Sequence, residues 1–382
     1  MSEQRLGIIM HGVTGRMGLN QHLRRSIMEI IADGGVELAN GDRVVPDPIL
    51  VGRNLEKVRK IADEHGIKRY TDDLDKALEN TEDALFFDAG TTDLRHDLLN
   101  RALSKGKHVY CEKPMSANLA EARQLCRLAK DKGVKTGVVQ DKLYLPGILK
   151  LRRLIGEDFF GRILFVKLDF GYWVFTGEGQ PAQRPSWNYQ KDRGGGIMLD
   201  MLAHWRYVLD NLFGPVQSIS SIAANHINQR WDEEGNAYEA DADDAVYAHL
   251  ELEGGIIAQV SSSWCTRVNR DDLLTIHVDG TDGSAVAGLN MCKVQRLDNT
   301  PRPVWNPDEA RPANYFDQWT EVDDINCENA FKHQWVAFIK HLYEDGPWEH
   351  TLEEGAKGVQ LAEAALESWK ERCWIEIKPI EF

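Results

Sequence analysis

The chain has 382 residues, of which 42% are hydrophobic and 27% are charged, and its formal net charge is −15. This length suits about two globular domains, and the composition is that of a soluble globular protein. The acidic balance argues against a nucleic-acid partner and against an anionic membrane surface, because both require basic footprints. No apolar run approaches about 18 residues and the N-terminus has no signal-peptide pattern, so we expect no membrane span and no secretion.

The six cysteines are scattered along the chain. They form no C-x-x-C pair and have no spacing typical of metal ligands. We therefore expect reduced thiols, a cytoplasmic protein and no metal site. The cysteines are Cys111, Cys126, Cys265, Cys292, Cys327 and Cys373.

The first 145 residues alternate short apolar runs with amphipathic segments. This alternation predicts an α/β domain with a doubly wound parallel sheet, in which ligands bind beyond the carboxyl ends of the strands. The predicted strands are 6–10, 49–51, 69–70, 84–87, 108–111 and 136–139, and the predicted helices begin near 19 and span 54–65, 73–80, 94–105 and 118–132. Residues 33–47 are rich in Gly and Asp, and we interpret them as a surface insertion.

A glycine-rich turn follows the first predicted strand and leads into a helix. In this context glycines let the backbone approach a pyrophosphate, whose charge then lies at the helix N-terminus. The spacing is GxxGxxG rather than GxGxxG, so an ordinary glycine-rich turn is the alternative. The predicted dinucleotide contacts in this turn are Gly12, Val13, Thr14, Gly15, Arg16 and Met17.

The ends of the other parallel strands supply the remaining predicted cofactor contacts. Arg53 stands where an NAD site usually has an acid for the ribose hydroxyl, so NAD and NADP both remain open. Lys113, in Glu112-Lys113-Pro114, is predicted to point into the crevice, although a lone Lys–Pro is usually only a loop. The predicted contacts are Gly52, Arg53, Asn54, Ala89, Gly90, Thr91, Thr92, Glu112, Lys113 and Gln140.

Residues 146–382 show a different pattern, with longer strands in succession. They predict an α+β domain with an open, mostly antiparallel sheet, one face of which is covered by helices. The C-terminal helix is expected to pack back towards the first domain. The predicted strands are 163–170, 219–225, 245–252, 255–263, 273–278 and 374–377, the predicted helices are 148–155, 330–344 and 352–371, and 301–317 is a predicted loop.

A central helix begins after Gly194-Gly195-Gly196 and ends at Gly214-Pro215. Asp200 and His204 are four residues apart, so a helix places them on one face, with Tyr207 continuing the row. A carboxylate and an imidazole in such an apolar helix must pair with each other or meet a polar ligand.

Three features together resemble the Gfo/Idh/MocA oxidoreductases, nearly from end to end. They are the Gly12/Gly15/Gly18 turn, the Glu112-Lys113-Pro114 stretch and the Gly195-Gly196…Asp200…His204 stretch. The resemblance implies a Rossmann domain, NAD(P) chemistry, a sugar or polyol substrate and a homodimer or homotetramer. It also implies that Lys113, Asp200 and His204 are the catalytic residues.

The sequence departs from the family pattern where substrate contacts are expected. Asp141-Lys142 replaces an Asn-Arg pair, Trp187-Asn188 replaces Trp-Arg, and Tyr207 replaces an Asp. Aromatic rings suit the C–H faces of sugars, although an ordinary aromatic core edge is the alternative. Basic groups suit an anionic sugar, although for most of the basic residues a solvated surface is the alternative. The predicted substrate contacts are Lys142, Tyr172, Trp173, Arg184, Trp187 and Tyr207, and Lys191, Arg193 and Arg206 are further basic candidates.

Hydride transfer from a secondary alcohol needs a proton acceptor and a charge for the developing alkoxide. We assign His204 as acceptor, oriented or charged by Asp200, and Lys113 as hydroxyl ligand and electrostatic stabiliser. Lys113 as the base also fits the sequence.

Three functions are compatible with this pattern. The first is an NAD(P)-dependent dehydrogenase or reductase acting on a sugar, glycoside or polyol, with hydride transfer at ring C3. The second is an NAD-dependent glycoside hydrolase that oxidises C3 transiently, on a sugar that carries a carboxylate or sulfonate, with Tyr172, Tyr207 or His226 as an extra acid–base group. The third is a non-catalytic NAD(P)-binding protein, which the presence of Lys113, Asp200 and His204 disfavours.

Overall fold

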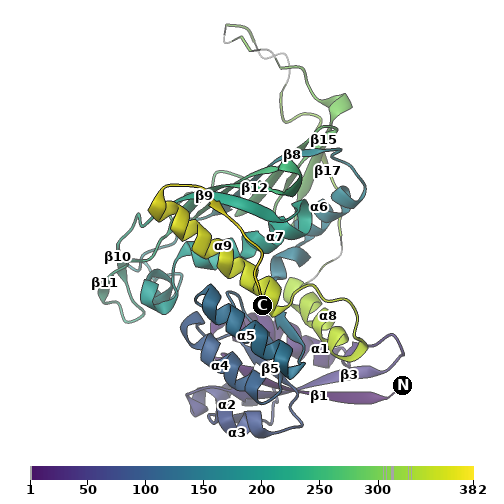
Figure 1. Ribbon diagram of the computed structural model, residues 1–382, viewed down its shortest axis with the longest axis vertical. Helices are drawn as coiled ribbons and strands as arrows, with labels where there is room; N and C mark the ends of the chain where they lie inside the picture. The colour runs from purple at the N-terminus through teal and green to yellow at the C-terminus, as the bar shows by residue number, and fades with distance from the viewer. Residues whose placement is uncertain (1, 304, 307, 311–313, 326, 328) are drawn as a thin grey trace.

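The computed structural model describes residues 2–303, 305–306, 308–310, 314–325, 327 and 329–382. The chain forms two sheet-containing domains, one above the other in Figure 1, with helix α9 (Leu352–Glu371) running between them. Within the described residues, no helix is both long enough and apolar enough to cross a membrane.

The first sheet is parallel except for one edge strand. Its order is β2-β3-β1-β5-β6-β7, with β4 beside β3, and only β2 runs antiparallel to its neighbour. This confirms the predicted doubly wound domain. The strands are β1 (Glu3–His11), β2 (Val36–Glu37), β3 (Arg43–Val51), β4 (Tyr70–Thr71), β5 (Leu85–Asp88), β6 (His108–Cys111) and β7 (Thr136–Val138).

The interpretation of residues 33–47 as a surface insertion was wrong for the parts of that stretch that belong to strands β2 and β3. Strand β3 begins at Arg43, and Val36, Leu38 and Val44 are buried in the core. The sequence hid this strand because Pro46 and Pro48 interrupt it. Both prolines lie in register with β1, so a strand with two missing N–H groups is still part of the sheet.

Helices cover both faces of the first sheet. One face packs against η1, a π-helical segment, together with α1, α2 and α8, and the other packs against α3, α4, α5 and the first part of α9. These helices are η1 (Met17–Ile27), α1 (Met28–Ala32), α2 (Leu55–Glu64), α3 (Leu74–Glu79), α4 (Thr92–Ser104), α5 (Leu119–Lys132) and α8 (Ala330–Glu344). The core of the first domain therefore includes Trp335 and Phe338, which come from near the end of the chain.

The second sheet has nine strands in the order β17-β16-β15-β14-β8-β13-β12-β9-β18. Only β8 and β13 are parallel neighbours, which confirms a mostly antiparallel sheet. The strands are β8 (Ile163–Gly171), β9 (Val216–Ala224), β12 (Ala245–Leu252), β13 (Ile257–Ser263), β14 (Leu274–Gly280), β15 (Gly283–Ala287), β16 (Cys292–Arg296), β17 (Thr320–Glu321) and β18 (Ile375–Glu376). A separate hairpin pairs β10 (Gln229–Trp231) with β11 (Ala237–Glu239).

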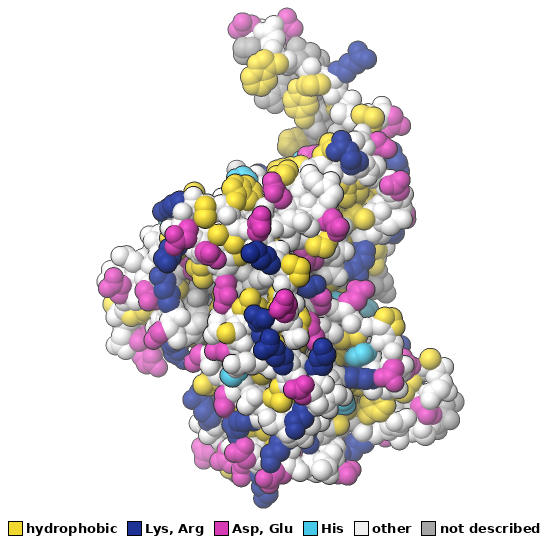
Figure 2. Space-filling model, in the orientation of Figure 1, with side chains coloured by type: hydrophobic (Ala, Val, Ile, Leu, Met, Phe, Trp, Pro, Cys, Tyr) yellow, Lys and Arg dark blue, Asp and Glu magenta, His cyan; other side chains and the backbone are white. Residues whose placement is uncertain are grey.

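Helices α6 (Pro146–Gly156), α7 (Ala203–Phe213) and α9 cover one face of this sheet (Figure 1). Strand β12 shows the consequence, because buried and exposed side chains alternate along it. Short helical turns complete the domain: η2 (Asp141–Tyr144), η3 (Ser186–Tyr189), η4 (Lys191–Arg193), η5 (Met198–Leu202), η6 (Glu253–Gly255) and η7 (Leu297–Asn299). On the face shown in Figure 2, acidic and basic side chains are interspersed.

Candidate active site

The glycine-rich turn after β1 has the shape that a dinucleotide site requires. A Cβ on Gly12, whose φ is +80°, would lie 2.4 Å from the Ala89 backbone, and one on Gly18 would lie 2.3 Å from the Gly12 carbonyl oxygen. These two glycines let the turn pack against the end of β5 and against the start of η1. Gly15 is exposed, and a Cβ there would meet only the Gly12 oxygen, at 3.3 Å. A helix N-terminus carries N–H groups without partners inside the helix, so an open backbone at the start of η1 suits a pyrophosphate.

Arg95 of α4 ties the neighbouring strand ends together. This buried guanidinium donates from Nε to Asp88 Oδ2 at 2.7 Å, from Nη2 to the Gly90 carbonyl oxygen at 2.6 Å and from Nη1 to that of Pro114 at 2.5 Å. His11 Nδ1 lies 2.7 Å from Asp88 Oδ1. Although burial alone would raise the pKa of Asp88, the charge of Arg95 and the hydrogen bond with His11 lower it. Arg95, which the sequence prediction missed, thus fixes the two loops after β5 and β6 that carry predicted cofactor contacts, and it reaches the end of β1 through Asp88.

The predicted cofactor residues occupy three kinds of position. Thr14, Arg16 and Arg53 are exposed around the glycine turn, whereas Val13 and Thr92 are buried. Other predicted residues have structural partners: Asn54 Oδ1 accepts the Lys57 N–H at the start of α2, and Gly90 N–H donates to Asp88. The buried Gln140 N–H donates to Gln334 of α8. Met17, Gly52, Ala89 and Thr91 complete this edge of the sheet.

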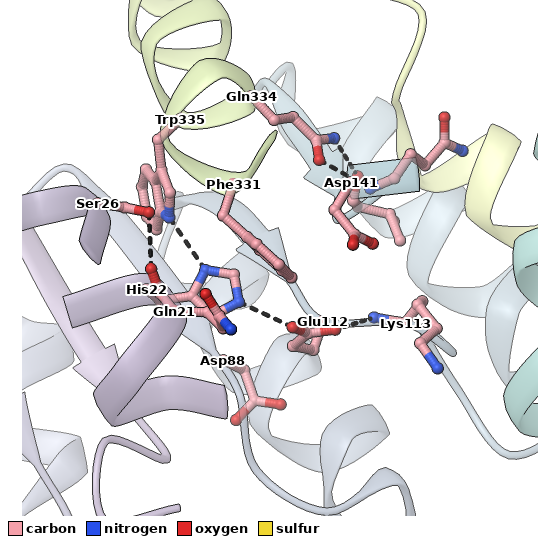
Figure 3. A network of polar contacts seen from close by, with 12 residues as sticks. Gln21, His22, Ser26, Asp88, Glu112, Lys113, Asp141, Phe331, Gln334 and Trp335 are labelled. Carbon is pink, nitrogen blue, oxygen red and sulfur yellow. Dashed lines mark hydrogen bonds and ion pairs between the residues drawn. The ribbon is translucent and has the colours of Figure 1, made fainter. Parts of the chain in front are cut away.

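Glu112 is held by a chain of contacts that begins on α8, as Figure 3 shows. The Trp335 indole N–H donates to His22 Nδ1 at 3.0 Å, and His22 Nε2 lies 2.8 Å from Glu112 Oε1. An indole can only donate, so Nδ1 is an acceptor and the His22 proton is on Nε2. Glu112 Oε2 accepts the backbone N–H of Lys113. Burial alone would raise the pKa of Glu112, but the hydrogen bond from His22 and nearby positive charges lower it.

Lys113 and Asp200 come from different domains and are brought together. The Lys113 ammonium forms an ion pair with Asp200 Oδ1, and Lys113 Nζ donates to the Asp200 carbonyl oxygen at 3.0 Å. Arg184 Nη2 donates to Asp200 Oδ2 at 2.7 Å. Burial would raise the pKa of Asp200, but the charges of Lys113 and Arg184 outweigh it and hold that pKa far below its usual range.

His204 does not pair with Asp200, which excludes the alternative in which the two residues pair with each other and contradicts the prediction that Asp200 orients His204. The physical reason is that two cations occupy the Asp200 carboxylate. His204 Nδ1 instead lies 2.6 Å from the Tyr207 hydroxyl, one turn along α7, and both side chains are buried. Burial, followed by the charges of Lys113, Lys142 and Arg184, holds the pKa of His204 well below its ordinary value.

One polar cluster is formed by Lys113, Arg184, Asp200, His204 and Tyr207, and Asp141 and Lys142 also belong to it. Sequence reasoning named Asp141 only as a departure from a family pattern. Asp141 is the first residue of η2, three residues after the end of β7, and it is buried. Its Oδ2 lies 2.5 Å from Lys142 Nζ. Its Oδ1 lies 3.9 Å from His204 Nδ1. The Lys142 backbone N–H donates to the Tyr207 hydroxyl at 3.3 Å.

Packing at the start of the central helix accounts for Gly194 and Gly196. A Cβ on Gly194 would lie 3.3 Å from Thr92 of α4, so the turn packs against the first domain. Gly196 has a φ of +114°, and a Cβ there would lie 2.6 Å from Asp243 Oδ1. The Asp243 carboxylate accepts the Met198 N–H at 2.7 Å, at the helix end where an acid is favourable. These contacts place Asp200 at the boundary between the domains.

The predicted substrate residues do not all reach this cluster. Tyr172 and Trp187 are half-buried, and the Tyr172 hydroxyl accepts a long, 3.5 Å hydrogen bond from Arg184. Trp173 instead stacks under Arg267 and lines a hollow with His226, Tyr247 and Cys265, none of which is in the cluster. Tyr172 and Trp173 both follow the end of β8, and Trp173 is held away from the cluster by an isolated β-bridge with Cys265.

The basic candidates are mostly occupied by acids. Arg206 donates to Asp210 at 2.6 Å, and Lys191 and Arg193 are exposed. Lys113 and Arg184 share Asp200, and Lys142 pairs with Asp141. Each cation of the cluster therefore contacts a carboxylate. In the described part of the chain, no group of His, Cys, Asp and Glu side chains is arranged to hold a metal ion.

Comparison with known proteins assigns both domains. Residues 48–140 match the oxidoreductase family with an NAD-binding Rossmann fold, and residues 148–286 match the GFO/IDH/MocA C-terminal domain. The glycine turn and its surrounding loops fit this cofactor, so the first domain is an NAD(P)-binding domain.

Two relatives illustrate the range of similarity. D-xylose dehydrogenase of Paenarthrobacter nicotinovorans is 49% identical over 378 residues, which cover 98% of this chain and 97% of that protein. Levoglucosan dehydrogenase of Pseudarthrobacter phenanthrenivorans is 23% identical over 361 residues, which cover 87% of this chain and 90% of that protein. The solved complex of levoglucosan dehydrogenase with NADH and levoglucosan has a TM-score of 0.80 at 20% identity over 98% of this chain and 99% of that one, which shows a shared fold. The chain therefore belongs to the Gfo/Idh/MocA family of oxidoreductases.

Proposed function

We propose that this protein is an NAD(P)-dependent dehydrogenase of a neutral sugar, with D-xylose as the first candidate substrate. The observation that carries the proposal is the meeting of Lys113, at the nucleotide edge of the first domain, with Asp200 and the adjacent His204 of the second. The 49% identity to a D-xylose dehydrogenase over almost the whole chain supports the choice of sugar.

The chain's own residues supply what alcohol oxidation requires. Bound NAD(P)+ supplies the hydride acceptor, and Gly12–Met17 and the loops fixed by Arg95 would hold it. Lys113 and His204 would contact the reacting hydroxyl, with the Lys113 ammonium stabilising negative charge on its oxygen. Asp200 holds Lys113 in place and is itself held by Arg184.

The charges of the cluster favour a neutral substrate. Lys113 and Arg184 share the Asp200 carboxylate and Lys142 contacts Asp141, so a sugar carboxylate or sulfonate would compete with carboxylates already in place. Half-buried Tyr172 and Trp187 offer rings for the C–H face of a sugar.

The test is a panel of D-xylose, other aldoses, a sugar acid and aryl glycosides, with reduced nicotinamide and aglycone followed in one reaction. We expect reduced cofactor to accumulate with D-xylose in proportion to the sugar consumed. Release of aglycone without reduced cofactor would instead support the redox-assisted glycosidase. The product settles the position of oxidation, since a keto sugar supports C3 and a lactone or aldonic acid places it at C1.

A further inference from the structure

The Tyr207 hydroxyl meets two groups, and their hydrogen-bonding capacity determines where its proton lies. The Lys142 backbone N–H can only donate, and it does so at 3.3 Å. The second neighbour is His204 Nδ1 at 2.6 Å. A phenol has one proton to donate and two lone pairs that accept. If Tyr207 donates to Nδ1, every donor and acceptor of this set is matched.

The opposite arrangement leaves a buried proton without a partner. If His204 Nδ1–H donated to Tyr207, the phenol would accept twice, and its own proton would need a third neighbour. Within the described residues, the Tyr207 hydroxyl oxygen has hydrogen bonds only with Lys142 and His204. Leaving a buried hydroxyl proton unsatisfied costs about 1–3 kcal/mol, which disfavours this arrangement.

The charges around the imidazole agree with a neutral ring that accepts from Tyr207. The charges of Lys113, Lys142 and Arg184 act on it from the surrounding loops and η2, and Asp141 Oδ1 is 3.9 Å away, too far for a hydrogen bond. Nδ1 is occupied by Tyr207. His204 Nε2 has no hydrogen-bond partner within the described chain, and it is not among the fully buried atoms that lack one.

We propose that Tyr207 is a positioning residue that holds His204 in the Nε2–H form, so that the imidazole donates a hydrogen bond to the substrate oxygen. This inference rests on the proposed dehydrogenase function, and it decides which of the two candidate bases acts. Lys113, which pairs with Asp200 as an ammonium, first releases a proton to solvent. Its amine then takes the substrate hydroxyl proton and becomes an ammonium again, while the hydride goes to the nicotinamide cofactor. His204 keeps its own proton throughout.

The first test needs no substrate and so is independent of the proposed function. Protein labelled with ¹⁵N only in histidine is examined by NMR at about pH 5.5–8, where free imidazoles titrate. The His204 signals are assigned by their loss in His204→Gln. We expect Nε2 to be protonated and Nδ1 to be unprotonated over the whole range. A proton on Nδ1 in the unmodified protein would overturn the inference.

The second test removes the hydroxyl. In Tyr207→Phe, Asp141 becomes the available acceptor, so we expect the ring proton to shift towards Nδ1 and kcat to fall by about tenfold or more with a smaller change in KM. The kcat of this variant should also gain a pH dependence in the imidazole range. Tyr172→Phe is the matched control, because its hydroxyl contacts Arg184 and not His204, and it should leave the His204 signals in place.

A Tyr207→Phe protein that binds NADH normally but keeps the Nε2–H form and a flat pH profile would refute the role of Tyr207. If that variant fails to fold, the NMR measurement on the unmodified protein still decides. If no sugar is oxidised at all, the dehydrogenase proposal fails while the position of the His204 proton is still determined.

Discussion

Lys113 of the first domain and Asp200 of the second form an ion pair, which is reinforced by a hydrogen bond from Lys113 Nζ to the Asp200 carbonyl oxygen. The pair fixes the amine at the boundary where the nucleotide loops meet the central helix. A group so placed is suited to act on a hydroxyl without holding the cofactor itself.

Lys113→Met should therefore abolish turnover and leave the cofactor in place. We expect kcat to fall by about 10³-fold or more, because both the charge and the amine are lost, while the Kd for NADH changes by less than about threefold. Steady-state kinetics and quenching of protein fluorescence by NADH measure the two effects. Lys332→Met, which removes a lysine paired with Asp33 outside the site, should keep normal turnover. A Lys113→Met enzyme of near-normal rate would remove this residue from the mechanism.

Arg95→Met should destabilise the protein strongly, because it leaves the Asp88 carboxylate buried without its main partner. We expect the free energy of unfolding in urea to fall by about 3–5 kcal/mol and the affinity for NAD(P)+ to fall with it. Arg101→Met breaks pairs with Asp75 and Asp97 at the surface of the same helix and should cost at most about 1 kcal/mol. Equal stability of the two variants would show that Arg95 is not a structural tie.

His350 should make stability pH-dependent in acid. Its Nδ1 contacts the Gln140 amide oxygen at 2.6 Å, and its Nε2 lies 2.9 Å from the Tyr144 hydroxyl. Burial, together with the charge of Arg152, lowers the pKa of His350 from 6.5 to about 4. The unfolded chain then binds more protons between these values, so stability is full above about pH 6.5 and is lost as the pH falls towards 4.

The loss due to His350 should amount to about 3 kcal/mol, from roughly 1.4 kcal/mol per pKa unit. Urea unfolding of the native protein and of His350→Gln at a series of pH values isolates this contribution, because all other titratable groups are common to both proteins. The difference between them should narrow as the pH falls. A constant difference would mean that His350 has an ordinary pKa in the folded protein.

Arg53→Ala should change the choice between cofactors. Arg53 is exposed at the end of β3, where no acidic side chain takes the position that favours NAD. We expect the Kd for NADP+ to rise about tenfold, which corresponds to one charge-assisted contact, and the Kd for NAD+ to change by less than about threefold. Isothermal titration measures both, and Arg59→Ala on the exposed side of α2 is the control. Equal weakening of both cofactors would exclude contact with a 2′-phosphate.

The elements that the sequence predicted well are those with a strong periodic pattern. The alternation in residues 1–145 and the helices at 330–344 and 352–371 follow directly from apolar spacing. Strand β3 was missed at its start because its prolines imitate a loop. Strands β15, β16 and β17 were not predicted.

The meeting of Lys113 with the Asp200–His204 helix was predictable from the sequence, but the partners of these side chains were not. Helical spacing placed Asp200 and His204 in one row, yet the Asp200 carboxylate binds two cations that lie elsewhere in the sequence. His22 and Trp335 are 313 positions apart, and neither has a local pattern that indicates the other. Spacing along one helix limits which side chains can meet, while the charges that decide among them come from the whole fold.

The packing of α8 against the first sheet has a consequence for how the protein is made. Trp335, Phe338 and Gln334 complete the core and the hydrogen bonds of a domain whose sheet ends at residue 138. A nascent chain that has left the ribosome only as far as that point exposes the apolar surface that these side chains later cover. The nucleotide-binding half must therefore wait for nearly the last portion of the polypeptide, and a fragment that stops near residue 145 should aggregate rather than fold.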